Sequence, residues 1–178
     1  MTNGPLPTRV HDLLSHSQFL HLATCSDNIP HVSLMNYTFI ENDPSSSNCE
    51  LLKSAQHMIL IATPQNTKKY NNLMKNNKVS LLVHDWVTPN QGGADSVLRL
   101  LQSINQSEVG ELSVTLDGHV FQNLIDPSTE EYKFFKNLHL QKNPEARAFI
   151  EGDSTAFVLI QIDESKVSDS NNNVENFK

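Results

Sequence analysis

The chain has 178 residues, which fits one domain, and 38% of them are hydrophobic, which is enough to build a core. Its 13 basic and 20 acidic residues give a net charge of -7, and this argues against a general nucleic-acid-binding protein, which needs a basic surface. Two cysteines are too few for a disulfide framework, and no apolar run is long enough to span a membrane. Because the N-terminus also lacks a signal-peptide pattern, we expect a cytoplasmic protein, with the nucleus as the alternative.

The first part of the chain predicts a helix followed by strands. Thr8 can cap a short helix whose apolar stripe is Val10, Leu13 and Leu14. Residues 19–24 predict a strand, and residues 26–28 predict its turn. Residues 31–40 predict one longer strand. In it Ser33 and Met35 share one face, while Leu34 and Asn36 share the other.

The central unit, residues 57–86, has the clearest organisation. An apolar strand over residues 58–62 ends at Thr63, a short helix pattern follows Lys69, and a second strand covers residues 79–83. Thr67, Lys68 and Lys69 therefore gather where a strand passes into a helix. The free N–H groups of a helix N-terminus beside lysines suit a phosphate group. The alternative is that both lysines are solvated surface residues.

The second half of the chain is less regular. Residues 87–110 predict an insertion with an amphipathic helix, and residues 111–124 predict a strand pair or one bent strand with a bulge or turn at Asp117-Gly118. Ser128 and Glu131 fit a helix capping box, and the expected buried stripe of that helix is Tyr132, Phe135 and Leu138. A final strand is expected over residues 156–162.

These elements predict a mainly β protein, a six-stranded split β-barrel with short flanking helices. Strands follow one another without regular βαβ alternation, which favours a small barrel over a parallel sheet. The predicted domain covers residues 1–163, and residues 164–178 are expected to form a flexible tail. Side chains fill a barrel of this size, so a large ligand would bind outside it or between subunits.

The central unit resembles the FMN-binding split-barrel family typified by pyridoxamine 5′-phosphate oxidase. The matching pattern is Thr63, four further residues, Lys68-Lys69 and then Asn76-Asn77-Lys78-Val79-Ser80-Leu81-Leu82, with Pro30-His31-Val32-Ser33 upstream and a strand ending at Gly118 downstream. The resemblance covers roughly residues 10–162. It implies the split-barrel fold, FMN as cofactor and a homodimer with the flavin at its seam.

The resemblance also implies roles for individual residues. Lys68 and Lys69 would bind the FMN phosphate, Thr67 would add a hydroxyl, and Thr63 would lie beside the ribityl chain. Along the preceding strand Ser33, Leu34, Met35 and Asn36 would follow the isoalloxazine ring. Ser113 takes the position where the family often has a glutamine that contacts the flavin.

Two departures limit what the resemblance implies about the reaction. Ser33 stands where the family has an arginine, and the sequence lacks the C-terminal Arg and His contacts to pyridoxal phosphate. Oxidation of vitamin B6 therefore does not follow. We expect an FMN-dependent oxidoreductase of unassigned small-molecule substrate, with no assigned catalytic residue and no metal. The alternatives are a flavin or phospholigand sensor without turnover and a ligand-free interaction module.

Overall fold

The computed structural model describes residues 6–41, 57–85, 112–152, 154–169, 171 and 173–178. Its strands in chain order are β1 (Phe19–Ser26), β2 (Ile29–Asn36), β3 (Thr38–Glu41), β4 (His57–Pro64), β5 (Lys78–His84), β6 (Leu112–Leu124), β7 (Thr155–Asp169) and β8 (Val174–Phe177). The helices are α1 (Thr8–His16), α3 (Lys68–Lys75), α5 (Glu130–Lys142), the short 3-10 turn η1 (Pro144–Ala146) and α6 (Arg147–Ile150). The expected insertion at 87–110 lies outside the described residues.

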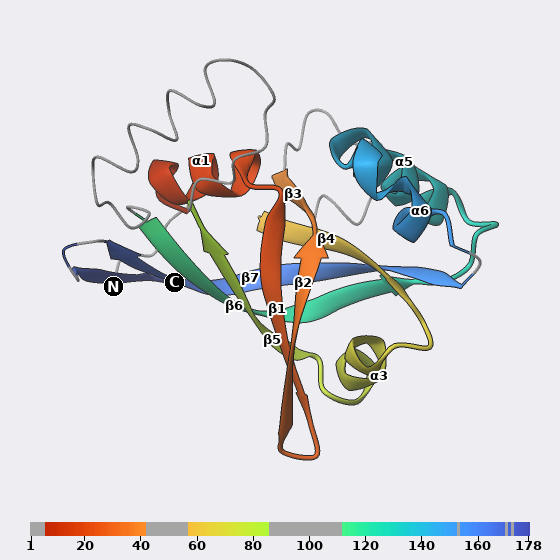
Figure 1. Ribbon diagram of the computed structural model, residues 1–178, viewed down its shortest axis with the longest axis horizontal. Helices are drawn as coiled ribbons and strands as arrows, with labels where there is room; N and C mark the ends of the chain where they lie inside the picture. Colours follow the sequence, from red (N-terminus) through yellow and green to blue (C-terminus); the bar gives the residue numbers. More distant parts are fainter. Residues whose placement is uncertain (1–5, 42–56, 86–111, 153, 170, 172) are drawn as a thin grey trace.

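The strands form an antiparallel sheet, and its two edge strands follow each other directly in the sequence (Figure 1). Its order is β2-β1-β5-β6-β7-β4-β3, with β8 added beside β7. The first and last strands of this path, β2 and β3, are separated in the sequence by the single residue Tyr37. The sheet therefore curls back on itself as a split barrel, as predicted, although the described residues contain eight strands rather than six.

The break at Tyr37 corrects the prediction of one strand over residues 31–40. β2 pairs with β1, whereas β3 pairs with β4 on the other side of the barrel. Tyr37 is buried, and its hydroxyl donates a hydrogen bond to the carbonyl of Leu14 at 2.8 Å. This bond fixes the residue at which the chain changes partners.

Two apolar cores hold the barrel together, one on each side of β4. Ile59 and Ile61 face the barrel interior, where the expected α1 stripe of Val10, Leu13 and Leu14 also packs. Met58 and Leu60 alternate onto the opposite face and pack under α5 and α6. The continuous apolar run of β4 is thus explained by burial on both faces.

The bulge expected at Asp117-Gly118 is present in β6, where the pairing with β7 shifts register. Glycine is required at 118 because a Cβ atom there would lie 2.3 Å from the carbonyl oxygen of Gln161 on β7. The resulting bend lets the 13-residue strand β6 pair with β5 at one end and with β7 along its length.

Three local predictions were wrong. The N-cap of α5 is Thr129, whose Oγ1 accepts from the N–H of Tyr132, and not Ser128, which instead bonds to Asp126. The N-cap position of α1 is Pro7, which makes no side-chain cap, and not Thr8. The region after residue 163 is not a loose tail, because β7 continues to Asp169 and pairs with β8.

Candidate functional site

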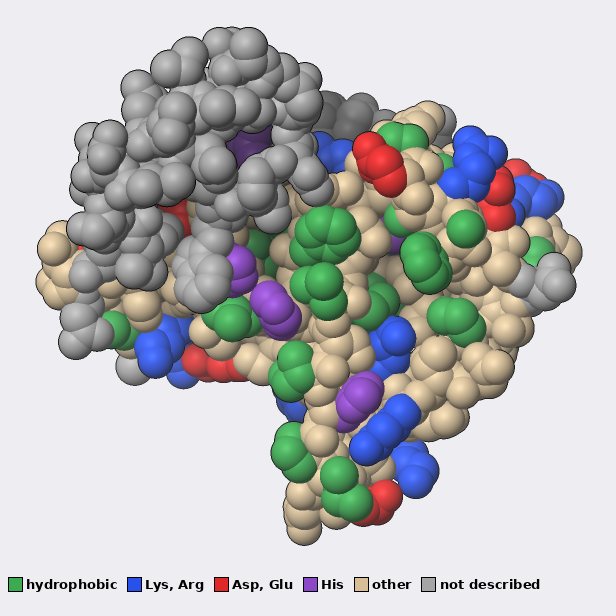
Figure 2. Space-filling view, viewed as in Figure 1, with side chains coloured by type: hydrophobic (Ala, Val, Ile, Leu, Met, Phe, Trp, Pro, Cys, Tyr) green, Lys and Arg blue, Asp and Glu red, His purple; other side chains and the backbone are tan. Residues whose placement is uncertain are grey.

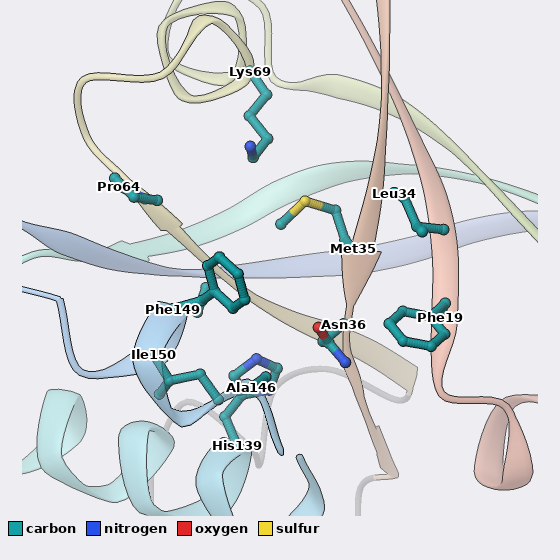
Figure 3. A pocket seen from close by; sticks show the side chains of 11 residues that line it. Phe19, Leu34, Met35, Asn36, Pro64, Lys69, His139, Ala146, Phe149 and Ile150 are labelled. Atoms are coloured by element: carbon teal, nitrogen blue, oxygen red, sulfur yellow. The ribbon is translucent and has the colours of Figure 1, made fainter. Parts of the chain in front are cut away.

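A pocket of about 310 Å³ opens between the end of β2 and the end of β4, two strands that do not pair with each other. Among the described residues its lining is mainly apolar and comes from β1, β2, β4, α3, α5, η1 and α6: Phe19, Leu34, Met35, Asn36, Ala62, Pro64, Lys69, His139, Ala146, Phe149 and Ile150. Lys69 lies at one end and His139 at the other, with Met35 and Phe149 between them (Figure 3). The pocket therefore has a cationic end and an uncharged, partly aromatic end.

The cationic end is built by the start of α3. Lys69 is half-buried and lines the pocket, whereas the neighbouring Lys68 is exposed and does not. Neither lysine has an ion-pair partner among the described residues, and no carboxylate is among those that line the pocket. A half-buried lysine without a counterion among the described residues, next to a helix N-terminus, is an arrangement that binds anions.

Thr63 and Thr67 hold the strand-to-helix joint in place. Oγ1 of Thr67 accepts from the N–H of Tyr70 as the N-cap of α3 and donates to the carbonyl of Pro64 at 2.9 Å. Thr63 is fully buried, with its hydroxyl 3.1 Å from that of Thr67. Both hydroxyls are thus engaged within the protein, and the predicted contacts to phosphate and ribityl chain stay predictions.

The β2 residues predicted to follow a flavin ring divide between pocket, interior and surface. Leu34, Met35 and Asn36 line the pocket, and Met35 is buried whereas Leu34 is 61% exposed. Ser33 does not line it, and its hydroxyl lies 3.2 Å from Nε2 of His31. Three consecutive residues of this strand are therefore brought to the cavity, and Ser33 lies one residue beyond it.

Ser113 lies outside the pocket. It pairs with His84 on β5 and with Ser168 on β7, whereas the pocket borders the other end of β7, where Thr155 pairs with Pro64. The register places Ser113 on the same face of the sheet as His84. Ser113 is not among the residues that line the pocket, and its contact with a flavin stays a prediction.

Sequence patterns did not predict three further lining residues of the pocket, which are Phe19, Phe149 and His139. Phe149 is 72% exposed at the edge of the cavity, an unusual position for a large aromatic side chain. Helical periodicity could have indicated His139. This residue follows Phe135 by four positions and continues the buried stripe of Tyr132 and Phe135, where Leu138 had been expected.

His139 belongs to a buried polar cluster with Thr38 of β3 and Asn143 at the end of α5. Nδ1 of His139 lies 2.9 Å from Oγ1 of Thr38, and Nδ2 of Asn143 donates to the carbonyl of Tyr37 at 3.1 Å. Burial lowers the pKa of His139 to about 4, so its ring is neutral near pH 7. The far end of the pocket is therefore polar without being charged.

Other site types find no support in the described part of the chain. No group of three His, Cys, Asp or Glu side chains there is arranged to hold a metal ion. None of the helices described has the length and apolar character needed to cross a bilayer.

Comparison with known proteins agrees with the fold. The family model described as pyridoxamine 5′-phosphate oxidase matches residues 6–159. A pyridoxamine 5′-phosphate oxidase homolog of Saccharomyces cerevisiae is 34% identical over 189 residues, covering 94% of this chain and 92% of that protein. A second homolog, from Schizosaccharomyces pombe, is 33% identical over 175 residues, covering 95% and 88%.

Solved structures share the fold at low sequence identity. A FAD-binding protein from Mesorhizobium loti superposes with a TM-score of 0.58 and 15% identity, covering 92% of this chain and 94% of that one. A heme binding protein from Mycobacterium smegmatis gives a TM-score of 0.60 and 12% identity, covering 97% and 59%. At these identities the likeness concerns the split-barrel architecture.

Proposed function

The chain belongs to the pyridoxamine 5′-phosphate oxidase family, and from this premise we propose that it is an FMN-binding oxidoreductase that acts on a small molecule. The observation that supports the proposal most directly is Lys69. This half-buried residue lies at one end of a mainly apolar pocket and has no counterion among the described residues. A phosphate bound there leaves the apolar part of the cavity for a ring.

The residues present fit FMN in three respects. Lys69 and the exposed Lys68 supply positive charge, and the backbone N–H groups of both residues have no acceptor among the described residues. The apolar lining, with Phe19 and Phe149, suits a flat aromatic ring. The strand β2 passes along the cavity at residues 34–36, which belong to the segment that the resemblance assigns to the flavin ring.

When bound, FMN supplies the redox chemistry, and the protein contributes binding, orientation and exclusion of water. Lys69 and the start of α3 would hold the phosphate through charge-assisted hydrogen bonds. Met35, Ala62 and Ile150 line the cavity with carbon atoms, which keeps water away from a ring placed there. We assign no catalytic acid or base, because the flavin itself carries the redox chemistry.

We also propose that the protein acts as a homodimer through the outer face of β2, β1 and β5. The strand register places Leu34, His21 and Leu82 side by side on that face. Val32 and Leu34 are 59% and 61% exposed, and hydrophobic side chains gather over this strand pair in Figure 2. Ser113 shares the face and therefore lies within the proposed interface.

The visible spectrum of the purified protein tests the proposal first. Absorbance bands of an oxidised flavin, or uptake of added FMN with quenching of its fluorescence, are expected. Anaerobic mixing with candidate reductants, including pyridoxamine phosphate, then separates an oxidoreductase from a sensor, since only the enzyme bleaches and reoxidises repeatedly. A colourless protein that takes up no FMN would contradict the proposal and favour an interaction module.

Sedimentation equilibrium tests the dimer separately. Leu34→Asp places a charge in the apolar patch and is expected to give monomers, whereas Lys133→Asp, on the exposed side of α5, should leave the association unchanged. A wild-type monomer at micromolar concentration would contradict the proposed dimer.

A further inference from the structure

The inner end of the pocket holds a hydrogen-bonding group that the proposed phosphate site does not use. His139 is only 1% exposed, yet its ring lines the cavity. Figure 3 shows the imidazole at the end opposite Lys69, close to Ala146 and Ile150 and below Asn36. A buried polar ring at the end of an otherwise apolar cavity requires an account of its hydrogen bonds.

The surrounding hydrogen bonds determine which imidazole nitrogen carries the proton. Nδ2 of Asn143 faces two backbone carbonyls, of Tyr37 and of His139, each at 3.1 Å, and this identifies the donor end of the amide. The same Nδ2 lies 3.2 Å from Oγ1 of Thr38. The amide presents only N–H groups to the Thr38 hydroxyl, so that hydroxyl directs its own proton elsewhere.

That proton goes to Nδ1 of His139, at 2.9 Å, because the described residues offer the buried Thr38 hydroxyl no other acceptor. An imidazole that accepts at Nδ1 and is neutral carries its hydrogen on Nε2. Burial lowers the pKa of this ring to about 4, which keeps it neutral at physiological pH. Nε2–H has no hydrogen-bond partner among the described residues.

We propose that Nε2–H of His139 binds the planar end of the pocket's occupant by donating to a carbonyl oxygen or ring nitrogen of a heteroaromatic ring. This inference rests on the proposed function. With the phosphate of FMN at Lys69, the acceptor belongs to the isoalloxazine ring or to a flat substrate beside it. A neutral donor selects for an uncharged acceptor edge, whereas Lys69 selects for an anion. The two ends therefore recognise different parts of one ligand.

A comparison of FMN with riboflavin separates these two contributions, because riboflavin lacks the phosphate. His139→Phe removes the donor and keeps a ring of similar size, so we expect both ligands to bind roughly tenfold more weakly. Lys69→Ala is expected to weaken FMN alone. His139→Gln, which restores an N–H donor, should recover part of the riboflavin affinity. Equal riboflavin affinity in wild type and His139→Phe would overturn the inference while leaving the FMN proposal intact.

The tautomer of His139 can be measured directly in the wild-type protein without a ligand. Nitrogen-15 NMR of the flavin-free protein distinguishes the two neutral tautomers of a histidine, and we expect His139 to be protonated at Nε2. Thr38→Val removes the hydroxyl that donates to Nδ1 and should reduce riboflavin affinity in the same direction as His139→Phe. Protonation at Nδ1 in the wild type would overturn the inference even if His139→Phe did not fold. A wild type that binds neither flavin overturns the proposed function, and the ring contact with it.

Discussion

The two neighbouring lysines at the start of α3 predict unequal effects on FMN binding. Lys69 is half-buried and lines the pocket, whereas Lys68 is exposed and does not. A charge-assisted hydrogen bond in a partly buried site contributes roughly 1.5–3 kcal/mol, and an exposed ion pair contributes about 0.2–1 kcal/mol. At 1.4 kcal/mol per factor of ten, Lys69→Ala should weaken FMN binding roughly 10- to 140-fold, and Lys68→Ala roughly 1.4- to 5-fold.

Fluorescence quenching of FMN and riboflavin by each variant measures this difference. Riboflavin affinity should stay at the wild-type value in both variants, because neither lysine is placed to hold the ring. Raising the salt concentration should reduce the Lys68 contribution first, since exposed charges are screened more strongly than half-buried ones. Circular dichroism checks that both variants keep the fold.

Two results would refute the reasoning about the cationic end. If Lys68→Ala weakened FMN more than Lys69→Ala, the phosphate would bind on the outer side of α3 and not in the pocket. If riboflavin and FMN lost affinity equally in Lys69→Ala, the side chain would be contacting the ring or supporting the fold. Either outcome would require a different placement of the ligand.

Three predictions concern the fold. The pKa of His139 is about 4 in the folded protein and 6.5 in the unfolded chain, so the unfolded chain binds the proton first as the pH falls. The free energy of unfolding should therefore fall by up to roughly 3 kcal/mol between pH 6.5 and pH 4. Chemical denaturation at several pH values should show a smaller fall in His139→Gln. Gly118→Ala drives a Cβ against the backbone of β7 and should lower stability by roughly 1–3 kcal/mol, measured as a lower Tm; an unchanged Tm would contradict the close approach. Thr129→Ala should cost about 1 kcal/mol through the lost N-cap of α5, whereas Ser128→Ala should cost less, and the reverse order would restore the capping box predicted from the sequence.

The sequence predicted those parts of the fold that depend on local patterns. Apolar periodicity located the barrel strands, and the Asp117-Gly118 pair marked the bulge. The break at Tyr37 was missed because no glycine or proline signals it. The change of partner is fixed by a hydrogen bond to Leu14, 23 residues away. The polar composition after residue 163 indicated a tail, but pairing of β8 against β7 and burial of Val167 give it structure.

The same distinction applies to the candidate site. The cationic end lies within one strand-to-helix connection, so Lys68 and Lys69 could be recognised from adjacent residues, whereas the N-cap role of Thr67 was not predicted. The other end depends on contacts between distant parts of the chain: His139 meets Thr38 across 101 residues. No spacing rule relates such positions, and a lone histidine in a helical stripe is most simply interpreted as a core residue.

The arrangement of the two ends also explains why the pocket lies where the barrel is split. A closed barrel of this size fills its interior with side chains, as the inner core around Ile59 does here. Among the described residues, space for a ligand lies beside the end of β2, just before the chain changes partners at Tyr37, and α3 and α5 border it at opposite ends. Each helix contributes one polar group, a cation from α3 and a neutral donor from α5. A ligand with an anion at one end and a polar-edged ring at the other satisfies both groups, and this chemical asymmetry favours a phosphorylated heteroaromatic cofactor over a simple phosphate or a purely apolar compound.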